Sequence, residues 1–127
     1  MNISELLTRN GRIYPDEIAL IELRPSKNLR TVITWKEFDD KANQFANSLN
    51  SMGVNRGDKV IHWMMNSLDW LIAYFGIIRT GAWAVPLNFR FNSQDFEYCA
   101  EIAEANVMVL GEEFIERVDA VRSRIPH

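Results

Sequence analysis

The most regular hydrophobic pattern of the chain lies between Thr34 and Gly53. Its apolar residues recur every three or four positions: Phe38, Ala42, Phe45, Ala46, Leu49 and Met52. This spacing places them on one face of an α-helix. Thr34 and Glu37 have the spacing of a capping box at the start of that helix, and Gly53 supplies the left-handed residue that ends it. We therefore predict an amphipathic helix between Thr34 and Gly53.

Two short β-rich runs precede this helix. Ile18–Ile21 and Leu29–Ile33 flank the polar segment Pro25–Asn28, an arrangement that predicts a β-hairpin. The amphipathic segment Ile3–Thr8 comes before them, and Pro15 marks its end because a helix does not continue through proline. We predict a short helix over Ile3–Thr8, followed by the hairpin.

Strands and helices alternate in the rest of the chain. Apolar runs bounded by turn residues predict three strands, at Lys59–Met64, Ala82–Leu87 and Val107–Leu110. Their regular spacing, with a helical pattern after each, is typical of βαβ units. The sequence therefore predicts the α/β class, with a parallel sheet connected by right-handed crossovers.

The helix predicted after the first of these strands, Ser67–Thr80, has an unusual composition. We expect Asn66 to cap it, Asp69 to lie in its first turn and Gly81 to end it. Its apolar residues lie on nearly every side: Leu68, Trp70, Leu71, Ile72, Tyr74, Phe75, Ile77 and Ile78. A helix that is apolar all round is buried all round. Because so few other elements are predicted to cover it, the sequence indicates a slice of a larger body.

Two further helices are predicted towards the C-terminus. Asn92 is expected to cap a helix that continues to about Glu104, with Asp95 three positions after the cap. A last helix is predicted over Glu112–Arg124. No stretch rich in Gly, Ser or Pro interrupts residues 1–127, so we expect no domain boundary within them.

Composition and charge exclude several classes of protein. The 127 residues are 47% hydrophobic and 24% charged, which is ordinary for a globular domain and rules out disorder. The formal net charge of −3 excludes the general basic field of a nucleic-acid-binding protein. Cys99 is the single cysteine, so neither an intrachain disulfide nor a cysteine-based metal site can form. One cysteine also favours a reducing compartment.

Nothing in the sequence indicates secretion or a membrane span. Met1–Leu7 has neither the basic region nor the long apolar stretch of a signal peptide. The longest apolar stretch, Trp70–Ile78, is shorter than the ~18 residues that a spanning helix needs. We expect a cytoplasmic protein.

No catalytic group of residues can be identified in the sequence. His62 lies in a predicted strand, where a structural histidine with satisfied hydrogen bonds is expected, and His127 is the last residue. Cys99 shares a helical face with Phe96, Ala100 and Ala103, which favours a core thiol over a nucleophile. Metal ligands at a recognised spacing are absent from the sequence. The sequence thus identifies no catalytic residue, no metal ligand and no cofactor-binding residue.

Other polar and aromatic residues also favour structural roles. Asp39 and Asp40 are adjacent in a predicted helix and face different ways, so we expect solvated carboxylates. The tryptophans are expected in core or interface packing: Trp35, Trp63, Trp70 and Trp83. The isolated arginines are expected to face water: Arg79, Arg90, Arg122 and Arg124. The glycines occur singly, so neither common phosphate-loop pattern is present.

The segment Gly81–Arg90 has two interpretations. Pro86 ends a predicted strand, which places Asn88 and Arg90 at the carboxyl end of that strand. Ligands bind at this edge of open α/β sheets. A tight turn before the next helix is the alternative, and the local residues favour the turn.

Four segments in order resemble motifs of one family. Thr34–Phe38 matches a first core motif, Thr-Tyr-x-Glu-Leu, with Trp for Tyr and Phe for Leu. Gly53–Val60 is similar to a Gly-Val-x-x-Gly-Asp-x-Val turn and strand, and Ile77–Arg90 to a second core motif, Leu-Lys-Ala-Gly-Ala-x-x-Val-Pro-Leu-Asn-x-Arg. Pro15–Leu20 is a weaker match. The chain therefore resembles the extreme N-terminal part of the AMP-forming acyl-CoA synthetases, within the adenylate-forming superfamily that includes luciferases and peptide-synthetase adenylation domains.

The resemblance implies a parent enzyme that uses ATP, Mg²⁺ and CoA to activate a fatty or other small carboxylic acid. It also implies that residues 1–127 are a partial N-terminal, AMP-binding domain, truncated before the loop that holds the ATP phosphates. Family members are several times longer, and their phosphate loop, later Thr-Glu motif, ribose-binding Asp and C-terminal catalytic Lys have no counterpart here. We therefore expect this chain alone to be inactive and to bind none of these cofactors.

Two alternatives stay open at this point. The chain could be a complete small α/β interaction module, or part of an adenylate-forming enzyme that does not use CoA. If it is a slice of a larger enzyme, its partner is the remainder of that enzyme. Uncovered apolar faces and strand edges then predict that the isolated chain associates with itself.

Overall fold

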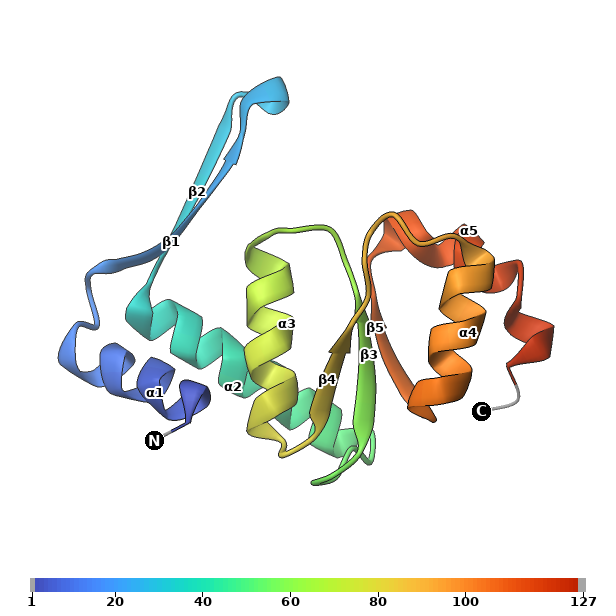
Figure 1. Cartoon of the computed structure of the whole chain (residues 1–127). Coiled ribbons are helices and arrows are strands. Elements are labelled where there is room, and N and C mark those ends of the chain that lie inside the picture. Colours follow the sequence, from blue (N-terminus) through green and yellow to red (C-terminus); the bar gives the residue numbers. More distant parts are fainter. Residues whose placement is uncertain (1, 126–127) are drawn as a thin grey trace.

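A three-stranded parallel sheet organises the computed structural model, which describes residues 2–125 (Figure 1). The strands are β3 (Lys59–Trp63), β4 (Trp83–Pro86) and β5 (Val107–Leu110), in the order β4-β3-β5. Both neighbours of β3 run parallel to it, so that His62 is paired with Pro86 on one side and Val109 on the other. The predicted α/β class with a parallel sheet is confirmed.

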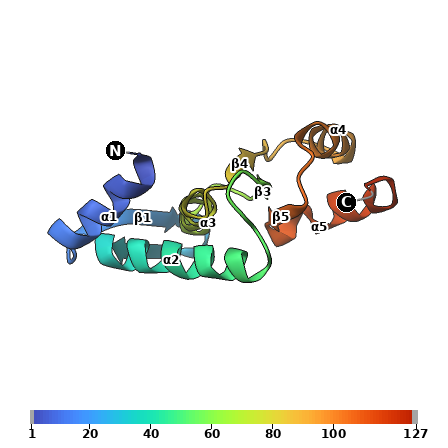
Figure 2. The same cartoon turned by 90° about the horizontal axis from the view of Figure 1, so that it is seen from below.

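Helices cover both faces of this sheet. Helices α2 (Trp35–Ser51) and α3 (Leu68–Arg79) lie on one side, and α4 (Ser93–Ala103) and α5 (Ile115–Asp119) lie on the other (Figure 2). Because side chains alternate along a strand, β3 contributes to two cores. One core, towards α2 and α3, contains Leu49, Val54, Val60, Ile77 and Ala82. The other, towards α4, contains Ile61, Trp63, Leu87, Phe96, Ala100, Ala105, Phe114 and Val121.

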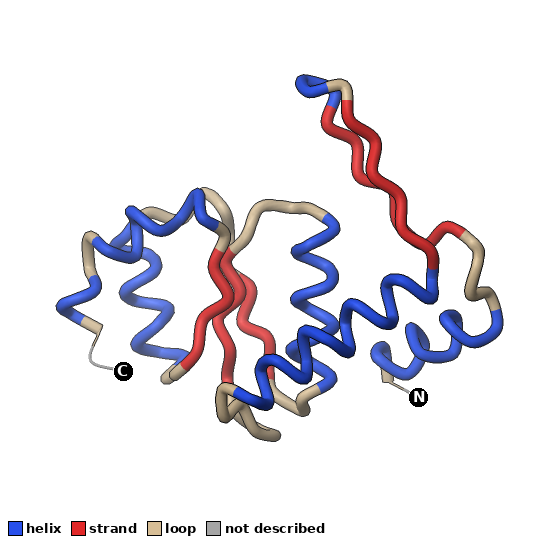
Figure 3. The backbone as a smooth tube through the Cα atoms, turned by 180° about the vertical axis from the view of Figure 1, so that it is seen from behind, coloured by secondary structure: helices blue, strands red, loops and turns tan. Residues whose placement is uncertain are grey.

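An antiparallel hairpin extends from the end of the molecule at which α2 begins (Figure 3). Its strands are β1 (Ile18–Arg24) and β2 (Leu29–Thr34), joined by a 3₁₀ turn, and Asn28 takes a left-handed conformation with φ 52°. The hairpin base packs on a third core formed by Leu7, Ile33, Phe38, Ala42 and Leu68. This confirms the predicted hairpin.

The first helix is longer than its sequence pattern indicates. Helix α1 spans Ile3–Ile13 instead of Ile3–Thr8. Asn2 and Glu5 form a capping box that starts it. Gly11 allows α1 to approach α2 closely, because a Cβ there would lie 3.1 Å from the Cβ of Asp39 on α2. The added residues of α1 therefore include a contact with α2 that the periodicity does not show.

The predicted ends of α2 are confirmed, with one exception on its apolar face. The side chain of Thr34 accepts from the Glu37 amide at 3.2 Å, and Glu37 accepts from the Thr34 amide at 3.1 Å. Gly53 follows the helix with φ +92°. Met52, predicted on the apolar face, is 66% exposed because it lies at the C-cap, beyond the last packed turn.

Of the capping residues predicted for the next two helices, one is wrong and one is confirmed. Ser67, not Asn66, caps α3, because its Oγ accepts from the Trp70 amide at 3.0 Å. Both residues are good caps, and sequence alone does not decide between neighbours of this kind. Asn92 caps α4 with Asp95 as its capping-box partner, as predicted.

The helix predicted over Glu112–Arg124 is wrong as a continuous element. The segment forms a 3₁₀ turn at Glu112–Phe114, the short helix α5 and a second 3₁₀ turn at Arg122–Arg124. Phe114 and Val121 are both buried in the core beside the sheet. Seating these two side chains breaks the regular helical path, so tertiary packing overrides the local pattern. His127 lies outside the described residues.

Helix α3 is less buried than its composition indicates. Leu68, Ala73, Gly76 and Ile77 are buried, whereas the remaining apolar side chains are only partly covered. Several large apolar side chains elsewhere are mostly exposed: Leu23, Trp83, Tyr98 and Ile102. None of the helices within residues 2–125 has both the length and the apolar character needed to cross a bilayer.

Candidate functional site

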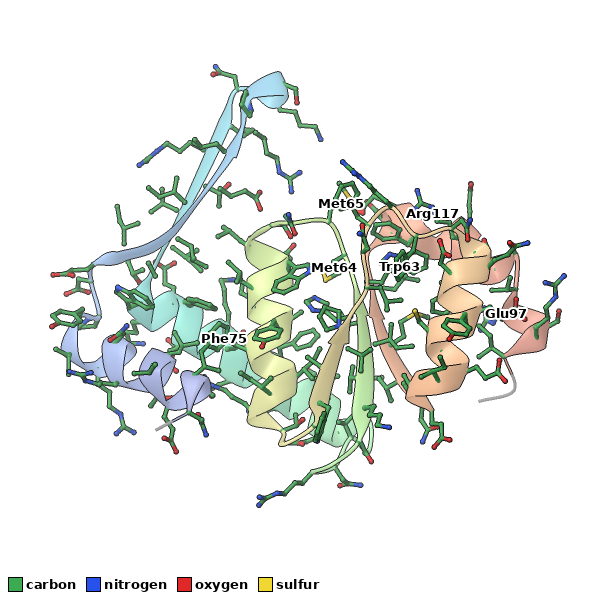
Figure 4. All side chains as sticks on the ribbon, in the orientation of Figure 1. Trp63, Met64, Met65, Phe75, Glu97 and Arg117 are labelled. Carbon is green, nitrogen blue, oxygen red and sulfur yellow. The ribbon has the colours of Figure 1, made fainter. Side chains whose placement is uncertain are left out.

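The carboxyl ends of the three parallel strands meet at one edge of the sheet, where ligands bind in open α/β folds (Figure 4). The loops that leave this edge start at Met64 after β3, at Leu87 after β4 and at Gly111 after β5. This edge is the place in the fold at which a site would be expected.

Trp63, the last residue of β3, is the structural centre of this edge. Its side chain is fully buried and stacks on Phe96 and Phe114, with ring centroids 5.2 Å and 4.7 Å away. Its indole Nε1 donates to the backbone carbonyl of Asn88 at 3.0 Å. One side chain therefore joins β3 to the loop after β4 and to the segment after β5.

Arg117 completes the same arrangement from α5. Its guanidinium lies over the rings of Trp63 and Phe114, 5.9 Å and 5.0 Å from their centroids. Its Nη1 donates to the carbonyls of Phe89 and Phe91, at 2.8 Å and 2.9 Å. These bonds fix the loop after β4. Sequence reasoning missed Arg117 because its partners lie 26 and 28 residues away along the chain and no spacing pattern links them.

The loop Leu87–Phe91 closes as a turn. The Asn88 side-chain oxygen accepts from the Arg90 amide at 2.9 Å, and the Phe91 amide donates to the Asn88 carbonyl at 3.0 Å. The guanidinium of Arg90 is exposed and lies 5.3 Å from the centroid of the Phe89 ring. Of the two interpretations of Gly81–Arg90, these bonds support the tight turn.

His62 is buried, but it is not the satisfied histidine that the sequence predicts. Its side chain is 0% exposed, and neither ring nitrogen has a hydrogen-bond partner within residues 2–125. The ring packs against Trp70 of α3, with centroids 4.5 Å apart. Burial lowers the pKa of His62 from 6.5 to about 4. A neutral imidazole held in an apolar core has no reacting partner, so we assign it no chemical role.

This histidine predicts a specific pH dependence of stability. The unfolded chain protonates His62 near pH 6.5, whereas the folded chain resists protonation down to about pH 4. The unfolded state therefore binds more protons within this window, and the free energy of unfolding falls by about 2 kcal/mol from this group between pH 7 and pH 5. Urea unfolding at both pH values measures it. The His62→Leu variant should lose this component, and an unchanged pH slope in that variant would contradict the assignment.

Cys99 lies where its helical face predicts. Cys99 is part of α4, and its thiol is free, half-buried and packed against the core between α4 and the sheet. Burial raises the pKa of Cys99, and the nearby Asp95 carboxylate raises it further. A raised pKa keeps the group a thiol at neutral pH, which does not suit a nucleophile.

Asp39 and Arg79 were both predicted to face water, and both predictions are wrong. They form an ion pair between α2 and α3, with side chains only 17% and 9% exposed. Arg79 also donates to Ser4 Oγ and Thr8 Oγ1 of α1, each at 2.9 Å, and to Asn43 Oδ1 at 2.8 Å. The guanidinium thus joins three helices, which an isolated arginine in a sequence does not reveal.

The remaining predicted residues have mixed outcomes. Asp40 is exposed and pairs with Lys36 at 2.7 Å, as expected of a solvated carboxylate. Arg122 and Arg124 are exposed at the surface, as predicted. Trp35 and Trp70 are partly buried and pack on aromatic neighbours, but Trp83 is 68% exposed. Trp83 is therefore not a core residue of this chain, and its prediction as an interface residue stays a prediction.

No group of three His, Cys, Asp or Glu side chains within residues 2–125 could hold a metal ion. A hollow of about 510 Å³ lies along β5 between α4 and α5 and is lined mainly by apolar side chains, including Phe96, Val118 and Ile125. It does not lie at the carboxyl edge. The hydrogen bonds of Trp63 and Arg117 hold the loop after β4 in place at the carboxyl edge.

The sequence of this chain is similar to that of known proteins over nearly its whole length. The sequence profile of the family described as AMP-binding enzyme matches residues 7–126. The chain is 29% identical over 126 residues to the putative acyl-CoA synthetase YngI of Bacillus subtilis, covering 98% of this chain and 22% of that protein. It is 30% identical over 126 residues to a medium/long-chain-fatty-acid–CoA/3-oxocholest-4-en-26-oate–CoA ligase of Mycolicibacterium smegmatis, covering 99% of this chain and 22% of that ligase.

Solved structures show the same relationship. The anthranilate CoA ligase AuaEII in complex with anthranoyl-AMP superimposes with a TM-score of 0.88 at 28% identity, covering 99% of this chain and 23% of that one. The N-terminal domain of FACL13 from Mycobacterium tuberculosis superimposes with a TM-score of 0.86 at 28% identity, covering 96% of this chain and 30% of that one. The chain thus spans about a fifth of the length of the curated relatives it matches. With fold and sequence in agreement over nearly all its residues, this chain belongs to the AMP-binding enzyme family.

Proposed function

We propose that this chain is the N-terminal portion of an ATP-dependent, AMP-forming carboxylic acid–CoA ligase. The observation that carries the proposal is the family match over residues 7–126. The relatives to which this chain is similar include an acyl-CoA ligase several times longer than this chain. The superposition on a CoA ligase that holds an acyl-AMP supports the same reaction class.

In the proposed parent enzyme, a carboxylate attacks the α-phosphorus of ATP and forms acyl-AMP with release of pyrophosphate. The thiol of CoA then displaces AMP and forms the thioester. ATP, Mg²⁺ and CoA are the cofactors that this reaction requires. A fatty or other small-molecule carboxylic acid is the substrate.

The two arginines described beside the loop after β4 do not form a site for the nucleotide phosphates. At the carboxyl edge of the sheet, Arg117 is engaged with two backbone carbonyls and two aromatic rings. Arg90 is exposed and its guanidinium lies over the ring of Phe89. We therefore assign no step of the reaction to residues 2–125. Their proposed role is to hold the loops and layers on which the rest of the enzyme is built.

Two other functions remain as alternatives. A stand-alone α/β interaction module would share the architecture without the reaction, because fold alone does not determine function. An adenylate-forming enzyme without a CoA step would share the first half-reaction only. Reading the coding frame beyond His127 separates the first alternative from the proposal: a Gly-rich, Lys-containing loop supports the ligase, and an immediate stop supports the module.

The direct test uses the complete polypeptide encoded by that reading frame. We expect incorporation of labelled pyrophosphate into ATP only when a carboxylic acid is present, and formation of an acyl thioester when CoA is added. Exchange without thioester formation would support the alternative that lacks CoA. Failure of exchange over a broad panel of carboxylic acids would contradict the ligase proposal.

The isolated chain is expected to associate with itself. The outer edges of β4 and β5 are unpaired within residues 2–125. Trp83 on β4 and Ile102 on α4 line one hollow and are 68% and 61% exposed. Sedimentation velocity at micromolar concentrations should show concentration-dependent oligomers, and the double variant Trp83→Glu, Ile102→Glu should reduce them. A clean monomer of the unmodified chain at these concentrations would contradict this expectation.

A cytoplasmic location also forms part of the proposal. The free thiol of Cys99 and the single cysteine in 127 residues fit a reducing compartment.

A further inference from the structure

The hairpin β1–β2 packs against the helices only near its base, and its outer part is largely uncovered. Ala19, Leu20 and Ile33 pack at the base against Leu68 and Phe38. Further along, the apolar side chains are exposed: Ile21 by 50%, Leu23 by 63% and Leu29 by 53%. Figure 1 shows the two strands rising away from α1 and α2, towards the end of the molecule at which α3 begins. A hairpin held only at its base would be free to change direction.

One polar contact joins the hairpin to the body above its base. Glu22 Oε1 accepts from the backbone amide of Leu68 at 2.8 Å, a bond between residues 46 apart in the sequence. Glu22 Oε2 accepts from Arg24 Nε, also at 2.8 Å. The Glu22 side chain is only 18% exposed, so water competes weakly for this bond.

Leu68 is well suited to receive such a contact. It is the first residue of α3, and the first amides of a helix have no partner within the helix. A carboxylate there also meets the positive end of the helix dipole. The bond from Leu68 is the largest cause that lowers the pKa of Glu22, followed in that direction by Arg24. The buried side chain of Leu68 meanwhile packs beneath the hairpin base, so that one residue holds the hairpin from two sides.

We propose that Glu22 is a latch that sets the direction of the hairpin relative to α3. When its carboxylate is removed, the two strands remain paired with each other but swing as one unit about the base at Ala19, Leu20 and Ile33. The latch also anchors the start of α3, and with it the loop Met64–Ser67 at the carboxyl edge of the sheet. This inference concerns the chain itself and does not depend on the proposed ligase activity.

The test measures amide exchange and residual dipolar couplings of the 127-residue chain by NMR, with Trp83→Glu and Ile102→Glu present throughout to reduce self-association. In the chain that keeps Glu22, the Leu68 amide should be protected although it lies in the first turn, and the couplings of hairpin and helices should fit one alignment. In Glu22→Ala, Leu68 should exchange about tenfold faster or more. The couplings of both strands should shrink together while the pairing of Ile21 with Val32 persists.

Matched variants keep the outcome decisive. Glu22→Gln keeps an acceptor but loses the charge, so Leu68 should exchange at an intermediate rate. Glu17→Ala removes an exposed carboxylate next to the same hairpin and should change neither measurement. An unprotected Leu68 in the chain that keeps Glu22 would overturn the latch. So would unchanged hairpin couplings in Glu22→Ala, because the apolar base alone would then fix the direction.

Discussion

Replacing Trp63 by alanine is expected to lower the free energy of unfolding by about 3–5 kcal/mol. The side chain is fully buried between the rings of Phe96 and Phe114, and its loss leaves a cavity where three segments meet. The substitution also removes the donor to the Asn88 carbonyl. Because the residue links the carboxyl ends of all three strands, we expect the loops of this edge to lose order together. Urea unfolding followed by circular dichroism measures the effect.

Two variants separate the parts of this prediction. Trp63→Phe keeps a ring in the stack but loses the hydrogen bond to Asn88, and should cost about 1–2 kcal/mol. Trp83→Ala removes an indole that is 68% exposed, and should change stability by only about 0.5 kcal/mol. A loss in Trp63→Ala no larger than the loss in Trp83→Ala would show that Trp63 does not organise this edge.

The second large effect is expected from Arg79→Ala, again about 3–5 kcal/mol. This change leaves the Asp39 carboxylate, which is 17% exposed, without its ion-pair partner between α2 and α3. It also leaves Ser4 and Thr8 on α1 without the guanidinium that binds them. We therefore expect α1 to detach first, so that its amides exchange faster than those of α4.

An exposed ion pair provides the control for Arg79. Lys36 and Asp40 form a 2.7 Å pair on the same helix as Asp39, with side chains 63% and 50% exposed. Lys36→Ala should cost at most about 0.5 kcal/mol, since water and salt screen such pairs. Equal losses in Lys36→Ala and Arg79→Ala, or unaltered exchange of α1 in Arg79→Ala, would contradict the account of the buried pair.

The sequence predicts those parts of the fold that local patterns control. The capping box of Thr34 and Glu37, the left-handed Gly53 and the cap at Asn92 depend on residues a few positions apart, and all three are present in the structure. The three parallel strands follow from the alternation of apolar runs and helical patterns, which is also local.

The features that were predicted wrongly or missed depend on contacts between distant segments. Arg79 joins residues 36 to 75 positions away, and Arg117 joins a loop 26 to 28 positions away. An arginine in either environment looks the same in the sequence as one at the surface. His62 failed for a related reason: strand position predicts that it is buried but not whether a partner faces its nitrogens. The exposed Trp83 fits a chain that covers only about a fifth of its longer relatives.

The most direct test of the central claim compares the 127-residue chain with the complete polypeptide of its reading frame. Both are assayed at equal concentration for carboxylate-dependent exchange of pyrophosphate into ATP. We predict exchange by the complete polypeptide and none above the protein-free blank by the chain, because the role proposed for residues 2–125 is that of a scaffold. Carboxylate-dependent exchange by the chain alone would contradict that claim.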